Sequence, residues 1–211
     1  VVWIPASEGL KTVTFKVSDG KTSVMQQYTL EVLAQGQSVN PASLEGTETL
    51  VINEILADPP DNLDGDANGD GLRETSQDEF VEICNKSFNE LDLGGYTLSD
   101  TTSVRHNFDN GILLASGKCI VVFGGGTLPN LDFEALTASS GGLSLNNTGD
   151  KVSLKNSAGL LLDEYIYGAE GGTNQSLTRN PDISGNFVEH TSLNQGALKF
   201  SQGKQNNGDP F

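Results

Sequence analysis

Short apolar segments, separated by turns rich in Gly, Asn and Asp, restrict the fold of this 211-residue chain more than any other feature. Segments of this kind are typical of β-strands. None of them carries the start and stop signals of a helix. The pattern predicts an all-β sandwich or barrel. We expect its strands at residues 50–57, 79–85, 96–99, 105–108, 118–123, 142–145, 151–154 and 161–167.

A separate β-hairpin is predicted near the start of the chain. Alternating apolar residues run from Thr12 to Ser18, Asp19-Gly20 forms a tight turn, and a second strand continues to about Leu33. The following residues, 34–47, are Gly, Ser, Asn, Pro and Gln in character, which indicates a linker. Because a lone hairpin cannot bury a core, it has to pack on a neighbour, pair with another copy or belong to a longer chain.

The charge of the chain excludes several classes of partner. The formal net charge is −16, and phosphate groups are attracted by basic surfaces. We therefore expect no direct nucleic-acid partner and no docking on anionic lipid. No apolar run reaches membrane-spanning length, so no membrane insertion is expected. No signal peptide is visible, and we expect the targeting segment to lie upstream.

The strongest chemical signal is an acidic segment between Asp58 and Glu82, where nine carboxylates stand against one cation, Arg73. Its centre has the spacing D-x-N-x-D-G, which is typical of the first half of a calcium-binding loop. Gln77 takes the place where such a loop needs a bidentate acid, and no flanking helices are expected. We predict a bound Ca²⁺ on a helix-free loop; the alternative is a solvated acidic loop. The expected ligands are Asp64, Asp66, Asn68, Asp70, the Leu72 carbonyl, Glu74, Asp78 and Glu79.

The two cysteines, Cys84 and Cys119, lie in two of the predicted strands. A disulfide between them is geometrically possible, but their spacing does not establish it. The sequence alone slightly favours two unpaired, buried cysteines.

Catalysis has little support in the sequence. Glu54 and Glu82 have similar apolar neighbours on strands that we expect to be adjacent, so a carboxylate pair is conceivable. We favour the interpretation that they help to set the register of the sheet. His106 and His190 have no nucleophile or metal partner by spacing, and the glycine run at 124–126 is interpreted as a turn. We expect no catalytic residues and no enzyme activity.

Several blocks of sequence, taken together, resemble a known family. VINEIL, DEFVEICNKSFNELDLGGYTLSD, HNFDNGILLASGKCIVVFGGG and GGLSLNNTGDKVSLKNSAGLLLDEYIYG occur in this order from about Leu50 to Gly168 and resemble a lamin tail domain of the secreted bacterial type. Residues 175–211 are similar to the tails that follow bacterial members. The hairpin, preceded by Trp3-Ile4-Pro5, resembles the end of a bacterial immunoglobulin-like or cadherin-like repeat.

The resemblance implies an immunoglobulin-like β-sandwich with an N-terminal hairpin segment. It divides the chain into the end of a repeat (1–36), a linker (37–48), the sandwich (49–168) and an extension that packs on or trails it (169–211). It also implies a non-enzymatic binding or structural module outside the cell or at the bacterial cell surface, with an unknown protein or glycan partner.

Two alternatives for the function stay open. One is an accessory domain of a secreted nuclease or phosphatase whose catalytic part lies outside this chain. The other is calcium-assisted carbohydrate binding, which needs a flat, exposed platform formed by Tyr96, Tyr165 or Tyr167.

Overall fold

The computed structural model describes residues 9–18, 23–32, 50–193 and 198–211. The chain divides into two units, Val1–Thr47 and Glu48–Phe211. In the first unit, β1 (Gly9–Ser18) and β2 (Ser23–Val32) pair antiparallel along their whole length, so the predicted hairpin is present. The predicted turn at Asp19-Gly20, the linker and Trp3-Ile4-Pro5 lie outside the described residues.

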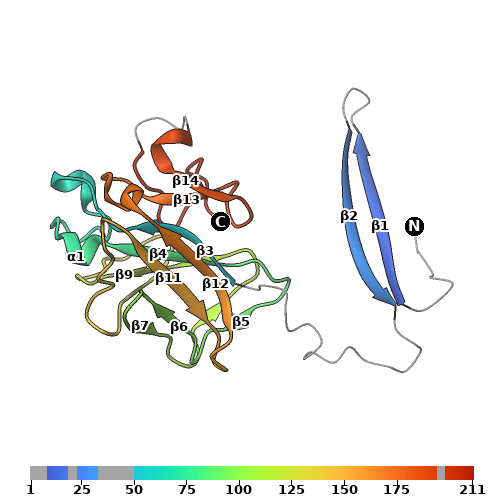
Figure 1. Ribbon diagram of the computed structural model, residues 1–211, viewed down its shortest axis with the longest axis horizontal. Coiled ribbons are helices and arrows are strands. Elements are labelled where there is room, and N and C mark those ends of the chain that lie inside the picture. The colour runs from blue at the N-terminus through green and yellow to red at the C-terminus, as the bar shows by residue number, and fades with distance from the viewer. Residues whose placement is uncertain (1–8, 19–22, 33–49, 194–197) are drawn as a thin grey trace. The chain divides into compact units, whose positions relative to one another are not determined.

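The second unit is the predicted β-sandwich (Figure 1). Its larger sheet has the order β10-β9-β4-β3-β13-β14, where the strands are β10 (Glu134–Thr137), β9 (Cys119–Phe123), β4 (Phe80–Asn85), β3 (Leu50–Leu56), β13 (Leu177–Asn180) and β14 (Asn186–Glu189). The smaller sheet has the order β12-β11-β6-β7, with β12 (Leu161–Tyr167), β11 (Asp150–Lys155), β6 (Thr97–Ser99) and β7 (Val104–Asn107). β5 (Leu91–Asp92) pairs with β8 (Leu113–Leu114). Strands β10 and β9 run parallel, and the other neighbours are antiparallel.

Helical structure in the described residues is limited to single turns. These are α1 (Thr75–Asp78) and the 3-10 turns η2 (Asn62–Gly65), η3 (Ala169–Gly172) and η4 (His190–Leu193). In this part of the chain no helix has the length and apolar character needed to cross a membrane.

The core lies between the two sheets and follows the alternation of the strands. Val81 and Ile83 of β4, Ile120 and Val122 of β9, and Leu154 of β11 are all buried in one cluster. Side chains one position along each strand point to the opposite face, so apolar residues at every second position fill the space between the sheets.

The outer face of the larger sheet is covered as well, since every residue of β3, β4 and β9 is buried. A β-bulge at Asn53 shifts the register of β3, so that Ile52 and Ile55 both face the core while Glu54 faces outward. Three rows cross the outer face. We call them the apolar row (Leu56, Phe80, Phe123), the acid row (Glu54, Glu82) and the cystine row (Val51, Cys84, Cys119).

Two features of the sandwich differ from the expectation. Residues 142–145 are not a strand, because Ser144 has a positive φ of 54° and the amide of Leu145 bonds to a side chain instead of a neighbouring strand. The extension after residue 168 does more than pack on the sandwich. Its strand β13 pairs with β3 and its strand β14 pairs with β13, so the extension forms one side of the larger sheet.

Candidate functional site

The acidic segment leaves β3, passes through η2 and α1, and returns at β4. The side chains at its centre accept hydrogen bonds from three consecutive backbone amides, those of residues 70–72. Asp66 accepts hydrogen bonds from the amides of Asp70 (3.1 Å) and Gly71 (2.9 Å). Asn68 accepts from the amide of Asp70 (3.0 Å), and Asp70 accepts from that of Leu72 (2.9 Å). The loop is therefore tightly wound, and Gly71 takes the left-handed φ of 88° that this path requires.

The loop rests on the glycine run that follows β9. Asp70 accepts from the amide of Thr127 (3.2 Å), and the Asn68 side chain donates to the carbonyl of Gly125 (3.2 Å). A Cβ at Gly124 would lie 1.9 Å from the carbonyl oxygen of Ser76, and one at Gly126 would lie 2.2 Å from the Asn68 amide nitrogen. The run is a turn, as predicted, and its lack of side chains is what allows the acidic loop to dock there.

The single cation of this segment does not neutralise its acids by direct contact. Arg73 donates to the carbonyls of Pro59 (2.5 Å) and Pro60 (2.9 Å) and to the hydroxyl of Thr75 (2.5 Å). It therefore ties the backbone of the loop together.

Asp78 and Glu79 have different roles from the rest of the predicted ligand set. Asp78 is buried and accepts from the amides of Asn68 (3.2 Å) and Glu74 (2.7 Å), which joins the two limbs of the loop, and burial raises its pKa. Glu79 accepts from the amide of Leu145 (3.1 Å), and burial raises the pKa of Glu79 to about 7. Its carboxylate is thus engaged by the segment that leads to β11, unlike those of Asp66 and Asp70, which bond within the loop and to Thr127.

The residues that fit a cation are therefore Asp66, Asn68 and Asp70, with Asp64, Glu74 and Leu72 exposed on the same loop. Their carboxylate and amide oxygens each have a further lone pair available. Within the described residues, one group of three His, Cys, Asp or Glu ligand atoms lies within 4.8 Å of one another, and it comes from Glu82, Cys84 and Cys119. The acidic loop, which lies within the described residues, has no such group. A calcium ion would thus have to draw the loop acids closer together.

The two cysteines form a disulfide, and the sequence-based preference for unpaired cysteines is wrong. They stand directly opposite each other on the antiparallel strands β4 and β9, with a Cα–Cα distance of 4.0 Å. The spacing of the two cysteines along the chain does not show that β4 and β9 place them opposite each other. The bond lies in the cystine row under Ile183 and Phe211.

The acid row is the second group of chemically interesting side chains. Glu54 accepts from the Ser176 hydroxyl (2.5 Å) and from both the amide (2.9 Å) and the hydroxyl (2.8 Å) of Ser201. Glu82 accepts from the Asn53 side chain (2.8 Å) and from the amide of Gly203 (2.7 Å). Both glutamates are fully buried. Burial raises the pKa of Glu54 to about 7, and burial together with the charge of Glu54 raises that of Glu82.

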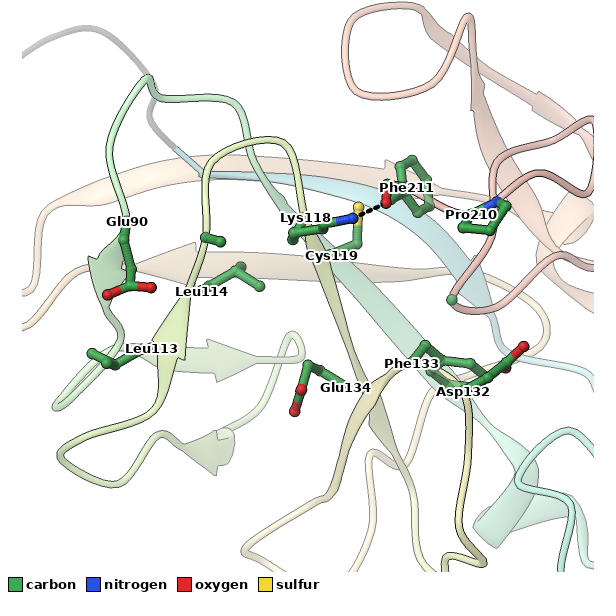
Figure 2. Close-up of a pocket in the computed structure, with 12 residues that line it drawn as sticks. Glu90, Leu113, Leu114, Lys118, Cys119, Asp132, Phe133, Glu134, Pro210 and Phe211 are labelled. Atoms are coloured by element: carbon green, nitrogen blue, oxygen red, sulfur yellow. Dashed lines mark hydrogen bonds between the residues drawn. The ribbon is translucent and has the colours of Figure 1, made fainter.

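Both glutamates of this pair are engaged by other groups of the fold. A surface cavity of about 320 Å³ lies beside the end of the chain (Figure 2), and neither glutamate lines it. In that cavity the Lys118 ammonium donates to the carbonyl of Phe211, with Glu90 and Leu113 on one side and Asp132 and Phe133 on the other. The glutamates instead hold the backbone of the C-terminal segment.

The two histidines and three tyrosines of the second unit pack against the fold. His106 is buried and lies edge-on to Phe108 at 4.5 Å between ring centroids, and His190 contacts the carbonyl of Leu198. Tyr167 is buried and Tyr165 stacks on Phe187 at 3.8 Å. Tyr96 is half-buried against the core. These three tyrosines therefore do not make the flat exposed platform that the carbohydrate-binding alternative needs.

The arrangement defines an immunoglobulin-like β-sandwich whose buried acids and cystine stabilise its layers. A family model described as Lamin Tail Domain matches residues 44–169, more than half of the 211 residues. The chain belongs to the lamin tail domain family, a non-catalytic immunoglobulin-like fold. A comparison with curated proteins finds no match. The family match ends before β13, so the C-terminal strands and the segment over the acid row lie beyond it.

Proposed function

We propose that this chain acts outside the cytoplasm as a non-catalytic lamin-tail module, a binding or spacer domain whose acidic loop is stabilised by calcium. The observation that carries the location is the buried Cys84–Cys119 disulfide, since such bonds persist in oxidising compartments and are rare in the cytosol. The net charge of −16 supports a partner that is neither nucleic acid nor anionic lipid.

Calcium is supported by the chemistry and the setting of the loop. Asp66, Asn68 and Asp70 offer hard oxygen donors, which suit calcium and not zinc. The nearby cation, Arg73, is used on carbonyl and hydroxyl oxygens, so the acids have no direct partner of opposite charge from it. The Leu72 carbonyl, Asp64 and Glu74 would complete the shell, and Asp78 would hold the loop from inside through its two amide contacts.

Calorimetric titration of the metal-free protein with Ca²⁺ tests this proposal. We expect saturable binding and a rise in melting temperature, because an ion at about a hundred times its Kd adds about 2.7 kcal/mol to the free energy of unfolding. The double variant Asp66→Asn/Asp70→Asn should lose both effects. Asp109→Asn, which removes an exposed carboxylate elsewhere, is the matched control and should keep them.

Mg²⁺ at the same concentration should bind more weakly, since it requires a smaller and stricter octahedral shell. If Ca²⁺ gives neither heat nor a shift in melting temperature, the acidic loop is held by its own hydrogen bonds, and the calcium part of the proposal is wrong.

A further inference from the structure

The C-terminal segment 198–211 lies across all three rows of the outer face. Phe200 packs edge-on against Phe80 of the apolar row, with 6.1 Å between ring centroids. Ser201 and Gly203 bond to the acid row, and Phe211 packs against the cystine row. The segment is thus bound to the sheet mainly through side chains of the sheet and not as a paired strand.

The acid row has no positive partner in contact with it. In the part of the chain that the structure describes, no Lys or Arg side chain bonds to Glu54 or Glu82. Arg179 pairs with Asp163 (2.9 Å), and Lys204 pairs with Asp132 (3.3 Å).

Asp182 acts on the pair and His190 acts on Asp182, and neither supplies a charge that would stabilise two carboxylates. Asp182, from the loop after β13, contacts the Asn53 side chain (3.4 Å) that also bonds to Glu82, so it adds a further acid. His190 of η4 is buried, and burial lowers its pKa, which favours the neutral ring. The segment itself presents Ser201 and Gly203, which carry no charge.

Two buried carboxylates on directly opposed positions of neighbouring strands cannot both ionise without a large cost in free energy. The amides of Ser201 and Gly203 and the Asn53 side chain can stabilise one negative charge that the pair shares. The Ser201 hydroxyl, which bonds the second oxygen of Glu54, can either donate or accept, so it also suits a protonated carboxyl. Apart from the Ser176 hydroxyl, which donates to Glu54 (2.5 Å), a second negative charge would meet no additional donor among the described residues.

We propose that residues 198–206 form a proton-controlled latch, which is closed over the outer face while Glu54 and Glu82 share a proton and opens when both are ionised. Opening would bring water to the acid row and uncover Phe80. Since burial raises the pKa of both glutamates, to about 7 for Glu54, the transition is expected between neutral and alkaline pH. The latch goes beyond the proposed function, and because Gln202 donates to the carbonyl of Ala67 in the acidic loop (3.0 Å), it is tested in calcium-free buffer.

Hydrogen exchange of the whole chain, followed by mass spectrometry from pH 5 to pH 9, tests the latch. The amides of Ser201 and Gly203 report it directly, because both bond to the acid row. After correction for the intrinsic rate, we expect their exchange to rise by up to about tenfold per pH unit as the pH approaches the transition, and to level off above it. The amides of β4 and β9 should stay protected over the same range.

Two variants test whether the acid pair causes the pH dependence of hydrogen exchange in the segment. Glu54→Gln/Glu82→Gln keeps the side-chain shape without the charge, and it should abolish the pH dependence of the segment. Asp209→Asn removes an exposed carboxylate from the same segment and should leave that dependence unchanged. If the double variant does not fold, infrared spectroscopy of Glu79→Gln decides, since this substitution removes the other buried acid whose pKa is raised to about 7: a protonated carboxyl band at pH 6 should disappear as the latch opens.

Three results would overturn the latch. One is exchange of β4 and β9 at the same rate as residues 201–203, since the whole sandwich would then be unfolding. Another is a folded double-Gln variant that keeps the pH dependence. The third is the absence of a protonated carboxyl band at pH 6.

Discussion

Gly124 shows how one residue determines whether the acidic loop can dock. Its α-carbon lies so close to the backbone of α1 that a Cβ would fall 1.9 Å from the carbonyl oxygen of Ser76. Because that oxygen belongs to the backbone, it cannot move aside as a flexible side chain would. The whole turn of α1 would have to shift, and Asp78 with it.

We therefore predict that Gly124→Ala lowers the free energy of unfolding by about 2–4 kcal/mol, measured by urea denaturation. The matched control is Gly142→Ala, where the nearest atom to a new Cβ is the Ser144 hydroxyl oxygen at 3.7 Å. That control should change stability by no more than about 0.5 kcal/mol. Equal effects of the two substitutions would show that the loop does not depend on this close approach.

At the same scale, the sequence shows which side chains of the acidic loop lie together but not every contact that they make. The spacing of Asp66, Asn68 and Asp70 marks three side chains that bond to consecutive amides of the loop. Asp78 and Glu79 were included because either could take the place of Gln77, yet the two carboxylates have different partners, the loop amides for Asp78 and Leu145 for Glu79. Adjacency in sequence does not show which way a side chain points at the start of a strand.

At the scale of the elements, β4 and β9 are joined both by their hydrogen-bond ladder and by the disulfide. The bond closes a loop with a sequence separation of 35 residues. In the chain-entropy model, a loop of that length restricts the unfolded state by about 3–4 kcal/mol.

We predict that Cys84→Ala/Cys119→Ala lowers the free energy of unfolding by about 3–4 kcal/mol. Thermal and urea denaturation with and without a dithiol reductant measure the effect. The unmodified protein should lose a similar amount in the reductant, whereas the variant should not respond to it. A reductant-sensitive variant, or an insensitive parent, would contradict the assigned role of the bond.

The elements also show where sequence reasoning works and where it stops. Strands β3, β4 and β9 are buried on both faces, so segments rich in apolar residues gave bounds within one residue of the structure, although β3 and β4 each include an Asn and a Glu. Strands β10 and β14 are short and largely half-buried or exposed, and they have no clear apolar pattern. Their pairing depends on neighbours distant in sequence, which a local pattern does not report.

At the scale of the whole molecule, buried acids set how stability depends on pH. Burial raises the pKa of Glu54 and of Glu79 to about 7 from an ordinary value near 4.5, and it raises that of Glu82 as well. The folded protein thus binds protons that the unfolded chain has released. Their contribution to stability is complete below pH 4.5 and is lost as the pH rises through 7.

Asp100 has the opposite effect on how stability depends on pH. Burial works against its ionisation, but hydrogen bonds from Arg105 and from the amides of Ser103 and Thr102 lower its pKa overall. Its contribution to stability is therefore lost as the pH falls below about 4. We predict greatest stability between about pH 4 and pH 4.5 and a loss of about 4 kcal/mol between pH 5.5 and pH 8, about 2 kcal/mol each from Glu54 and Glu79, measured by urea denaturation in calcium-free buffer. A free energy of unfolding that is constant or rises over this range would contradict the raised pKa values.

The pairing of β13 with β3 has a practical consequence for any shortened form of this protein. A recombinant fragment that stops at residue 169, where the family match ends, would lack β13 and leave one side of β3 without its neighbour. Unpaired backbone groups on such an edge invite strand-to-strand self-association, and two bare glutamates would face water beside it. Soluble, monomeric material should therefore be sought from chains that retain everything through Phe211.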